Sequence, residues 1–546
     1  MAAASVARPN FVLILTDTQA TNVIGAYGHP ELRTPNIDRL AETGIKFERA
    51  YTTCPVCTPA RAGLFTGIYP HTAGAWTNNL PLGDNIKTLG QRFRDAGYAT
   101  AYVGKWHLDG HDYFGTGICP DGWNPAYWYD GANYLAELTT EEITLWRRGL
   151  NSLEALRAHH IQPQFTWAHR VSDRAIAFLQ NRGSANERME ASANDVPLLK
   201  SHLSPVTNPE LPVVRPFVLV VSYDEPHHPF TCPPEYVERF AGYDYPLGPA
   251  AFDTLEGKPA HQREWAAASH VPQRVRETGV TRQPLYFGCN SFVDAEIGRV
   301  IDAGRAYAPD NTWIIFTSDH GELMGAHQLT GKGPAMYEEI THIPLIIEPP
   351  GGIASGAVNT TLASHIDLLP TLLELAGMDV PPILEGDSLV AQLGGAENPD
   401  KAVFMEFNRY EIEHDSWGGF QPVRCVVSGQ YKLVLNLHHT DELYDVQTDP
   451  AEVHNRIDDP AYAAIRDALH DRLLEWMYTK RDPFRGAVWE RRPWRDTRRL
   501  QWRGAFRPRP ADGYAPQVRD YDTGLPTRGV DVETFDAPPT ARPPGV

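Results

Sequence analysis

Phe11-Val12-Leu13-Ile14-Leu15-Thr16-Asp17 is an unbroken apolar run that ends in a hydroxyl group and a carboxylate. Three other segments share this form, in which an apolar run precedes charged or imidazole side chains: 98–103 before Lys105 and His107, 217–221 before Asp224 and His227, and 313–316 before Asp319 and His320. Continuous apolar runs of this length are typical of strands covered on both faces, as in a parallel sheet. The pattern therefore predicts a buried, mostly parallel sheet.

Helical patterns lie between these runs. Residues 36–43 follow Thr34-Pro35 and end before Gly44, and residues 88–96 form a second segment of this kind. A cap, a first-turn proline and a terminal glycine are typical of short helices. Strands that alternate with helices predict an α/β fold, in which ligands bind at the carboxyl ends of the strands. The polar side chains after the four runs are therefore expected to form a single site.

Length and texture predict two domains and a tail. At 546 residues, the chain is too long for one core of ordinary size. We expect an N-terminal catalytic α/β domain at 1–399, with a long insertion at 109–215, and a smaller C-terminal α+β domain at 400–480. Residues 481–546 are rich in arginine and proline and predict an extended tail. We expect this tail to wrap over the protein itself or over a neighbouring subunit, in which case it would form a homo-oligomer contact; a disordered end is the alternative.

Composition and charge exclude several classes of partner. A net charge of −19 disfavours nucleic acid, and it requires that an anionic substrate meet a locally positive pocket. The six cysteines lack the regular spacing of a disulfide framework and suit a reducing compartment. The residues before the first apolar run are too few and too weakly basic for us to expect a signal peptide, and no segment reaches the length of a transmembrane helix. We therefore expect a cytoplasmic protein without a membrane partner.

The most informative short motif is Cys57-Thr58-Pro59-Ala60-Arg61. Cys54 and Cys57 also form a Cys-x-x-Cys, which elsewhere serves as a redox pair or as half of a zinc site. A structural zinc site needs a second cysteine pair, and the remaining cysteines of this chain stand alone. Counting from Cys57, the third position is Pro59 and the fifth is Arg61, whereas counting from Cys54 these positions are Val56 and Thr58.

Two of the predicted strand ends also carry the donors of a metal site. Asp17 and Asp319-His320 would bring two carboxylates and an imidazole together. Carboxylate oxygens favour calcium or magnesium, whereas the imidazole leaves manganese and zinc open. A divalent ion beside Cys57 could polarise an anionic ester and favour a deprotonated nucleophile.

One aromatic patch in the insertion is a candidate substrate surface. It consists of Trp123, Tyr127, Trp128 and Tyr129. These rings could stack on a sugar or an aryl group, although such patches are more often core or lid packing.

The motif at Cys57 resembles the signature of the sulfatase family, in the alkaline phosphatase superfamily. Further elements fall in the family's order: 10–19, Gly104-Lys105-Trp106-His107, Pro226-His227-His228-Pro229, 317–322, Gly331-Lys332-Gly333, 365–377 and 442–450. The resemblance covers roughly residues 9–480. It implies an alkaline phosphatase-like fold, with a large mixed, mostly parallel sheet sandwiched by helices and a smaller C-terminal α+β domain.

The resemblance implies that a formylglycine-generating enzyme oxidises Cys57 to formylglycine, whose hydrated aldehyde attacks the sulfur of an aryl, alkyl or carbohydrate sulfate ester. It also implies that Asp17, Asp319, His320 and the modified Cys57 hold one divalent cation, expected to be Ca²⁺, with Mg²⁺ and Mn²⁺ as alternatives. Many members have a second aspartate where this chain has Thr18. Either Thr18 supplies a neutral oxygen or the second ligand comes from elsewhere.

The same resemblance implies roles for five further side chains. Arg61 would hold the hydrated aldehyde and balance negative charge. His227 and Lys332 would bind the ester oxygens and protonate the departing alcohol. Lys105 and His107 would contact the sulfate or the hydrated aldehyde, and one of them would help to break the covalent sulfate intermediate.

Two alternative functions stay open. Phosphonate monoester hydrolases and phosphodiesterases of the same superfamily use the same modified residue, but they tend to carry tyrosine and threonine where this chain has Lys105 and His107. A non-catalytic anion-binding protein would keep Cys57 unmodified. Asn78 either faces the substrate or packs as a polar loop residue.

Overall fold

The structure is a computed structural model that describes residues 8–183, 215–308, 311–352, 354, 356–414 and 416–497. Part of the predicted insertion, 184–214, lies outside the described residues. The same holds for 498–546, so most of the predicted tail and its proposed subunit contact also lie outside them.

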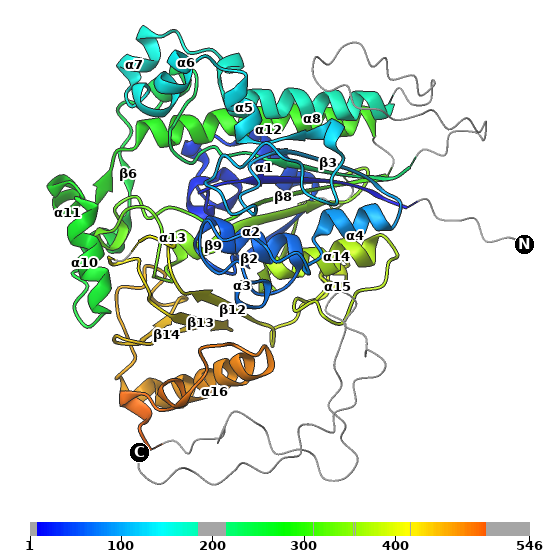
Figure 1. Ribbon diagram of the computed structural model, residues 1–546. Coiled ribbons are helices and arrows are strands. Elements are labelled where there is room, and N and C mark those ends of the chain that lie inside the picture. Colours follow the sequence, from blue (N-terminus) through cyan, green and yellow to red (C-terminus); the bar gives the residue numbers. More distant parts are fainter. Residues whose placement is uncertain are drawn as a thin grey trace, which may run out of the picture.

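A large mixed sheet forms the centre of the described part, and it confirms the predicted fold class (Figure 1). Its nine described strands follow the order β10-β2-β9-β8-β1-β5-β3-β4, with β11 beside β2. Their bounds are β1 (Asn10–Thr16), β2 (Ile45–Tyr51), β3 (Ala99–Gly104), β4 (Trp128–Tyr129), β5 (Phe217–Ser222), β8 (Thr312–Ser318), β9 (His342–Glu348), β10 (Ala357–Asn359) and β11 (Ala363–Ser364). Only β9 runs antiparallel to its neighbours among the described strands of this sheet.

The four apolar runs of the sequence are the strands β8, β1, β5 and β3. They lie next to one another in the middle of the sheet and all run parallel. Their carboxyl ends therefore meet at one edge, as the sequence pattern predicts.

Helices cover both faces of the sheet. Side chains along each strand alternate between the two faces, so each central strand packs against helices on both sides. On β1, Val12 and Ile14 pack under α1 (Pro35–Thr43), α8 (Trp167–Gly183) and α12 (Pro284–Tyr307). Phe11, Leu13 and Leu15 pack on the other face with α2 (Cys57–Thr66), α4 (Leu89–Asp95) and α14 (Leu368–Leu375). Figure 1 shows α8 and α12 on one side of the sheet and α2, α4 and α14 on the other.

A smaller antiparallel sheet follows, as predicted for the C-terminal region. Its described strands are β12 (Ala402–Phe407), β13 (Val423–Ser428), β14 (Tyr431–Asn436) and β15 (Glu442–Asp445). The helix α16 (Ala463–Thr479) covers one face through Leu469, Leu473 and Trp476. This helix lies within the region 400–480 for which the sequence predicts an α+β domain.

The chain beyond α16 folds back onto this sheet. Asp482 pairs with the fully buried Arg424 of β13, and Arg492 binds both carboxylate oxygens of Asp441, at 2.7 and 2.8 Å. The described start of the predicted tail is therefore held by ion pairs within the same chain.

Shorter elements lie in the connections. They are the helices α3 (Pro70–Ala73), α5 (Gly131–Ala136), α6 (Thr140–Thr144), α7 (Leu153–Ala158), α9 (Pro234–Glu238), α10 (Ala260–Ser269), α11 (Gln273–Thr278), α13 (Glu338–Thr341), α15 (Val390–Leu393) and α17 (Ala487–Glu490), and the paired strands β6 (Tyr245–Pro246) and β7 (Val280–Thr281). No described helix is both long enough and apolar enough to span a bilayer.

The aromatic patch of the insertion packs into the protein, which favours the core-packing alternative. Trp123 contacts Tyr102 and lies 5% exposed, and Trp128 stacks on the same tyrosine at 5.3 Å. Tyr127 contacts Phe178, and Tyr129 is buried. These rings support the edge of the sheet beside β3.

Candidate active site

Two neighbouring parallel strands bring Asp17 and Asp319 together. Thr16 at the end of β1 is in register with Ser318 at the end of β8, and the amide of Asp319 donates to the carbonyl of Thr16 at 3.1 Å. The two aspartates therefore leave the sheet at the same point. Both side chains are completely buried.

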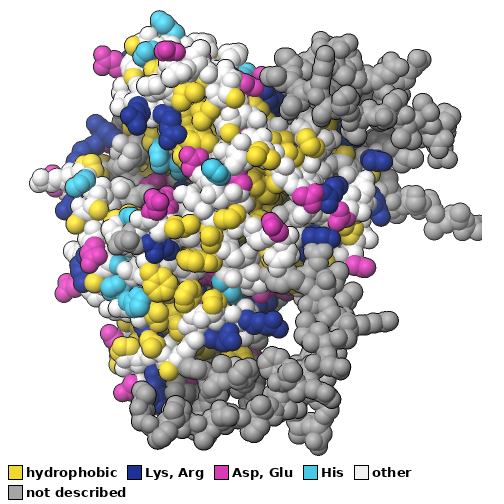
Figure 2. Space-filling view, in the orientation of Figure 1, with side chains coloured by type: hydrophobic (Ala, Val, Ile, Leu, Met, Phe, Trp, Pro, Cys, Tyr) yellow, Lys and Arg dark blue, Asp and Glu magenta, His cyan; other side chains and the backbone are white. Residues whose placement is uncertain are grey.

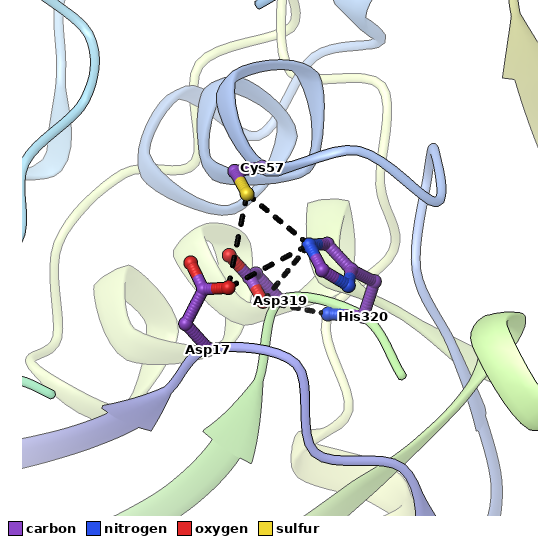
Figure 3. A group of neighbouring side chains, drawn as sticks. All are labelled: Asp17, Cys57, Asp319 and His320. Atoms are coloured by element: carbon purple, nitrogen blue, oxygen red, sulfur yellow. Dashed lines mark hydrogen bonds and ion pairs between the residues drawn. The ribbon is translucent and has the colours of Figure 1, made fainter. Parts of the chain in front are cut away.

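Asp17, Asp319, His320 and Cys57 form a group that could hold a cation. One possible donor atom from each lies within 4.8 Å of the others. Figure 3 shows the Cys57 sulfur and the His320 ring directed toward the two carboxylates. Two oxygens that each lie about 2.4 Å from a calcium ion are at most ~5 Å apart, so this spacing suits one shared ion.

The tautomer of His320 fits the same role. Its Nδ1 lies 3.0 Å from the carbonyl oxygen of Gly321, and because a carbonyl only accepts, Nδ1 carries the proton. Burial lowers the pKa of His320 well below its ordinary value, so the ring is neutral. Its Nε2 lone pair faces Asp319 Oδ1 at 3.6 Å and Asp17 Oδ1 at 3.8 Å, as a metal ligand requires.

The charges of the group also favour a cation. Burial would raise the pKa of Asp17, but Lys105 and Lys332 hold it well below its usual range. Burial, together with the charge of Asp17, raises the pKa of Asp319 to about 8. A cation between the two carboxylates would relieve their repulsion, because opposite charge favours the ionised form.

Arg61 is a fully buried guanidinium that orients both carboxylates. It donates to Asp17 Oδ2 at 3.0 Å and to Asp319 Oδ2 at 3.1 Å, which leaves the Oδ1 atoms facing His320. A third and a fourth bond fix it to the carbonyl of Lys105 and to Ser222 Oγ, both at 2.8 Å. In this structure Arg61 is directed at the candidate metal ligands, and its predicted contact with the hydrated aldehyde stays a prediction.

Cys57 occupies the first position of α2, a helix whose side chains are all buried. Its sulfur accepts from Lys332 Nζ at 2.9 Å and lies 3.7 Å from Asp17 Oδ1. Burial, followed by the charge of Asp17, raises the pKa of Cys57 to about 11. An unmodified thiol at this position would therefore be protonated at neutral pH and a weak nucleophile.

The side chain of Asn78 contacts the backbone of the first turn of α2. Its Oδ1 accepts the amide proton of Thr58 at 3.0 Å, so the side chain satisfies one of the free N–H groups at the start of α2. This contact supports the position of Cys57 from outside the helix.

Thr18 lies beside both candidate ligands. Its hydroxyl donates to Asp17 Oδ1 at 2.7 Å and its amide donates to Asp319 Oδ1 at 3.2 Å. The backbone takes a left-handed conformation, with φ of 63°. The hydroxyl oxygen is thus near the group, while its role as a ligand stays a prediction.

The two predicted histidines are both neutral. His227 Nδ1 lies 2.6 Å from the carbonyl oxygen of His228, so Nδ1 carries the proton and the lone pair is on Nε2. His107 Nε2 lies 3.1 Å from Asn79 Oδ1, and its buried Nδ1 has no partner among the described residues. Burial, then Lys105, lowers the pKa of both rings well below their ordinary value.

Asp224 is a site residue to which sequence reasoning gave no role. Lys105 Nζ lies between Asp224 Oδ1 at 2.9 Å and Asp17 Oδ2 at 2.8 Å, and it stands 4.9 Å over the Tyr113 ring. Asp224 Oδ1 is also 4.0 Å from His227 Nδ1. Its position directly after β5 was the available signal.

Three cationic side chains meet three buried carboxylates, those of Asp17, Asp319 and Asp224, in this site. Arg61, Lys105 and Lys332 converge there, although the whole chain carries a net charge of −19. Figure 2 shows acidic and basic side chains dispersed over the viewed face, without a broad patch of one sign. A cation bound between the carboxylates would offset their negative charge and leave the three basic side chains available to an anion.

Comparisons with known proteins agree with this geometry. Residues 9–378 match the sulfatase family, and residues 325–479 match the C-terminal region of N-sulphoglucosamine sulphohydrolase. The chain is 56% identical over 526 residues to the uncharacterized sulfatase YidJ of Escherichia coli, covering 96% of this chain and 98% of that protein.

Two solved structures share the fold at lower identity. One is the structure of a protein in complex with that protein's substrate, D-glucosamine-2-N,6-O-disulfate. It has a TM-score of 0.67 and 22% identity, and the match covers 87% of this chain and 99% of the other. The other is the phosphonate monoester hydrolase of Agrobacterium radiobacter, with a TM-score of 0.63, 24% identity and coverage of 87% and 96%. The sequence matches, the sheet and the site together show that the chain is an enzyme of the sulfatase family, in the alkaline phosphatase superfamily.

Proposed function

We propose that the protein hydrolyses sulfate monoesters after Cys57 has been converted to formylglycine, with one divalent cation held by Asp17, Asp319 and His320. The observation that carries the proposal is the position of Cys57. Its sulfur lies between the candidate ligands and Lys332, yet the surroundings raise the thiol pKa to about 11. A nucleophile formed from this residue would therefore stand next to both the cation and the lysine ammonium group.

When bound, the cation would withdraw charge from the anionic ester, and the formylglycine would supply an oxygen nucleophile in place of sulfur. Calcium is our first choice because carboxylate oxygens dominate the group, with magnesium and manganese as alternatives.

The protein's own residues divide the remaining work. Lys332 is an ammonium group next to the Cys57 sulfur, so it can bind an ester oxygen and donate a proton to the departing alcohol. His227 is neutral with its lone pair on Nε2, which suits it to accept a hydrogen bond or a proton rather than to donate one. Lys105, held by two carboxylates, adds a fixed positive charge for the sulfate oxygens.

Hydrolysis of phosphonate monoesters is the second candidate function, because an enzyme with that activity shares the fold. The fold does not separate the two reactions. We favour sulfate because Lys105 and His107 stand where those hydrolases tend to carry tyrosine and threonine.

The test has two parts on the same sample. Mass spectrometry of the peptide containing Cys57 should show the sulfur replaced by oxygen with loss of two hydrogens. The converted protein should then have a higher kcat/KM for an aryl sulfate than for the matching aryl phosphonate monoester, and Cys57→Ala should abolish both activities. Full activity with an unmodified thiol would contradict the mechanism, and a clear preference for the phosphonate would overturn the substrate assignment.

A further inference from the structure

A loop of the C-terminal domain reaches the side of the Cys57 helix. It joins β12 to β13, and its described parts are 408–414 and 416–422. The carbonyl of Tyr410 accepts the amide proton of Asn78 at 3.1 Å, and Asn78 holds the amide of Thr58. The loop is thus connected to the first turn of α2 through a single residue.

Three rings of this loop form a compact group. Tyr410 and His414 lie 5.8 Å apart, His414 and Trp417 5.2 Å, and Tyr410 and Trp417 6.1 Å between ring centroids. The Tyr410 amide closes the loop by donating to the carbonyl of Gly418 at 2.8 Å. We call Tyr410, His414 and Trp417 the aromatic wall.

Trp417 has a rigid support. It stacks flat on Trp265, with centroids 4.6 Å apart and an angle of 2° between the planes. Trp265 is 1% exposed and bonds the carbonyl of Thr330 through Nε1, whereas Trp417 remains partly exposed. One ring face of Trp417 is therefore covered by protein, and its orientation is fixed before any ligand arrives.

The aromatic wall stands next to Lys332. A Cβ atom placed on Gly333 would come within 2.8 Å of the Trp417 ring, and Gly333 directly follows the lysine that contacts Cys57. The charge of Lys332 also acts on the phenol of Tyr410. Burial, opposed by the charge of Lys332, raises its pKa to about 12. A neutral phenol can both donate and accept a hydrogen bond.

The direction of the leaving alcohol follows from these positions. If Lys332 protonates the departing oxygen, the organic part of the ester must extend on the Lys332 side of Cys57, where the aromatic wall stands. Faces of sugar and aryl rings pack well on aromatic side chains, and a phenol can also bond a ring hydroxyl.

We propose that Tyr410 and Trp417 bind the ring of the alcohol, so that the enzyme prefers esters whose sulfate lies on or next to a six-membered ring over acyclic alkyl sulfates. The inference rests on the proposed sulfatase function and extends it to a substrate class. An aryl ring and a pyranose ring share this chemistry, and the experiment separates them.

The test compares kcat/KM for 4-nitrophenyl sulfate, glucose 6-sulfate and butyl sulfate in the wild type, Trp417→Leu, Trp417→Phe and Tyr410→Phe. Trp417→Leu should lower kcat/KM for at least one ring ester by about tenfold or more and change that for butyl sulfate less than about twofold. Trp417→Phe should restore most of the loss. Tyr410→Phe should weaken only the sugar ester, because an aryl ring offers no hydroxyl to bond.

Phe420→Leu is the matched control, because Phe420 lies on the same loop, is 44% exposed and packs against Phe484 rather than in the aromatic wall. Equal effects of Trp417→Leu on all three esters, or no effect on any of them, would overturn the inference while leaving the sulfatase function intact. If converted wild-type protein cleaves none of the three esters, the proposed function itself fails and the inference falls with it.

Discussion

Replacing Asp224 by asparagine should show how far the site depends on the exact charge around Lys105. Asp224 is 3% exposed, and its carboxylate provides one of the two negative partners of a fully buried ammonium group. Removing one partner of a buried ion pair costs about 3–5 kcal/mol. Asparagine keeps the shape and an acceptor oxygen, and Asp17 stays in place, so we expect about 1–3 kcal/mol of that cost.

We expect this free-energy cost to raise the activation barrier of the reaction more than it lowers the free energy of unfolding. With Asp224 neutralised, Lys105 interacts more strongly with Asp17, which competes with the cation for that carboxylate. An increase of about 1–3 kcal/mol in the activation barrier lowers kcat/KM by about 5- to 150-fold. The concentration of Ca²⁺ or Mn²⁺ required for half-maximal activity should rise as well.

The assay measures kcat/KM for an aryl sulfate over a range of metal concentrations, together with the extent of Cys57 conversion in each preparation. Asp302→Asn is the control, because Asp302 is exposed and pairs with Arg39 on the surface. The reasoning is refuted if folded, fully converted Asp224→Asn protein keeps the wild-type kcat/KM and metal dependence.

Three further predictions concern stability and the cation. Burial would lower the pKa of His71, but the adjacent Glu406 raises it to about 9. The pair should therefore add about 3 kcal/mol to the free energy of unfolding below pH ~6.5, and this contribution should be lost as the pH rises through 9. Urea unfolding at pH 6.5 and 9 should show this loss in the wild type, and an equal loss in His71→Gln would contradict it. Asn78→Ala removes the acceptor of the Thr58 amide and should cost about 1 kcal/mol, whereas Asn78→Asp should not; identical urea midpoints for all three proteins would argue against this cap. Exhaustive chelation should abolish hydrolysis and added Ca²⁺ should restore it, so undiminished activity in EDTA would exclude the cation.

The central strands were predictable because each is an apolar run covered on both faces. Residues 11–15 and 217–221 fall within β1 and β5, and no polar residue interrupts them. The strand β2 was not predicted, because Lys46, Glu48 and Arg49 interrupt its apolar residues. The prediction that the polar residues after these strands form one site was correct for a related reason. Neighbouring parallel strands end at the same edge of the sheet, so the residues that follow them lie close together.

The parts of the site that sequence reasoning missed depend on contacts between distant segments. Tyr410 lies in a loop of the second sheet, and nothing local indicates that its carbonyl bonds Asn78. The aromatic residues that sequence reasoning selected, such as Trp123, instead fill the core beside β3. Hydrophobic pattern alone does not distinguish a ring that lines a site from a ring that fills a core.

The complete burial of α2 has a consequence for how the enzyme matures. Cys57 is 2% exposed, and every side chain of its helix is enclosed. A converting enzyme would need to handle this segment in extended form, so conversion is expected while the chain is still being synthesised or before it folds. Under the proposed function, a molecule that folds with an unconverted cysteine would remain inactive. The active fraction of a preparation would then depend on the rate of Cys57 oxidation relative to the rate of folding.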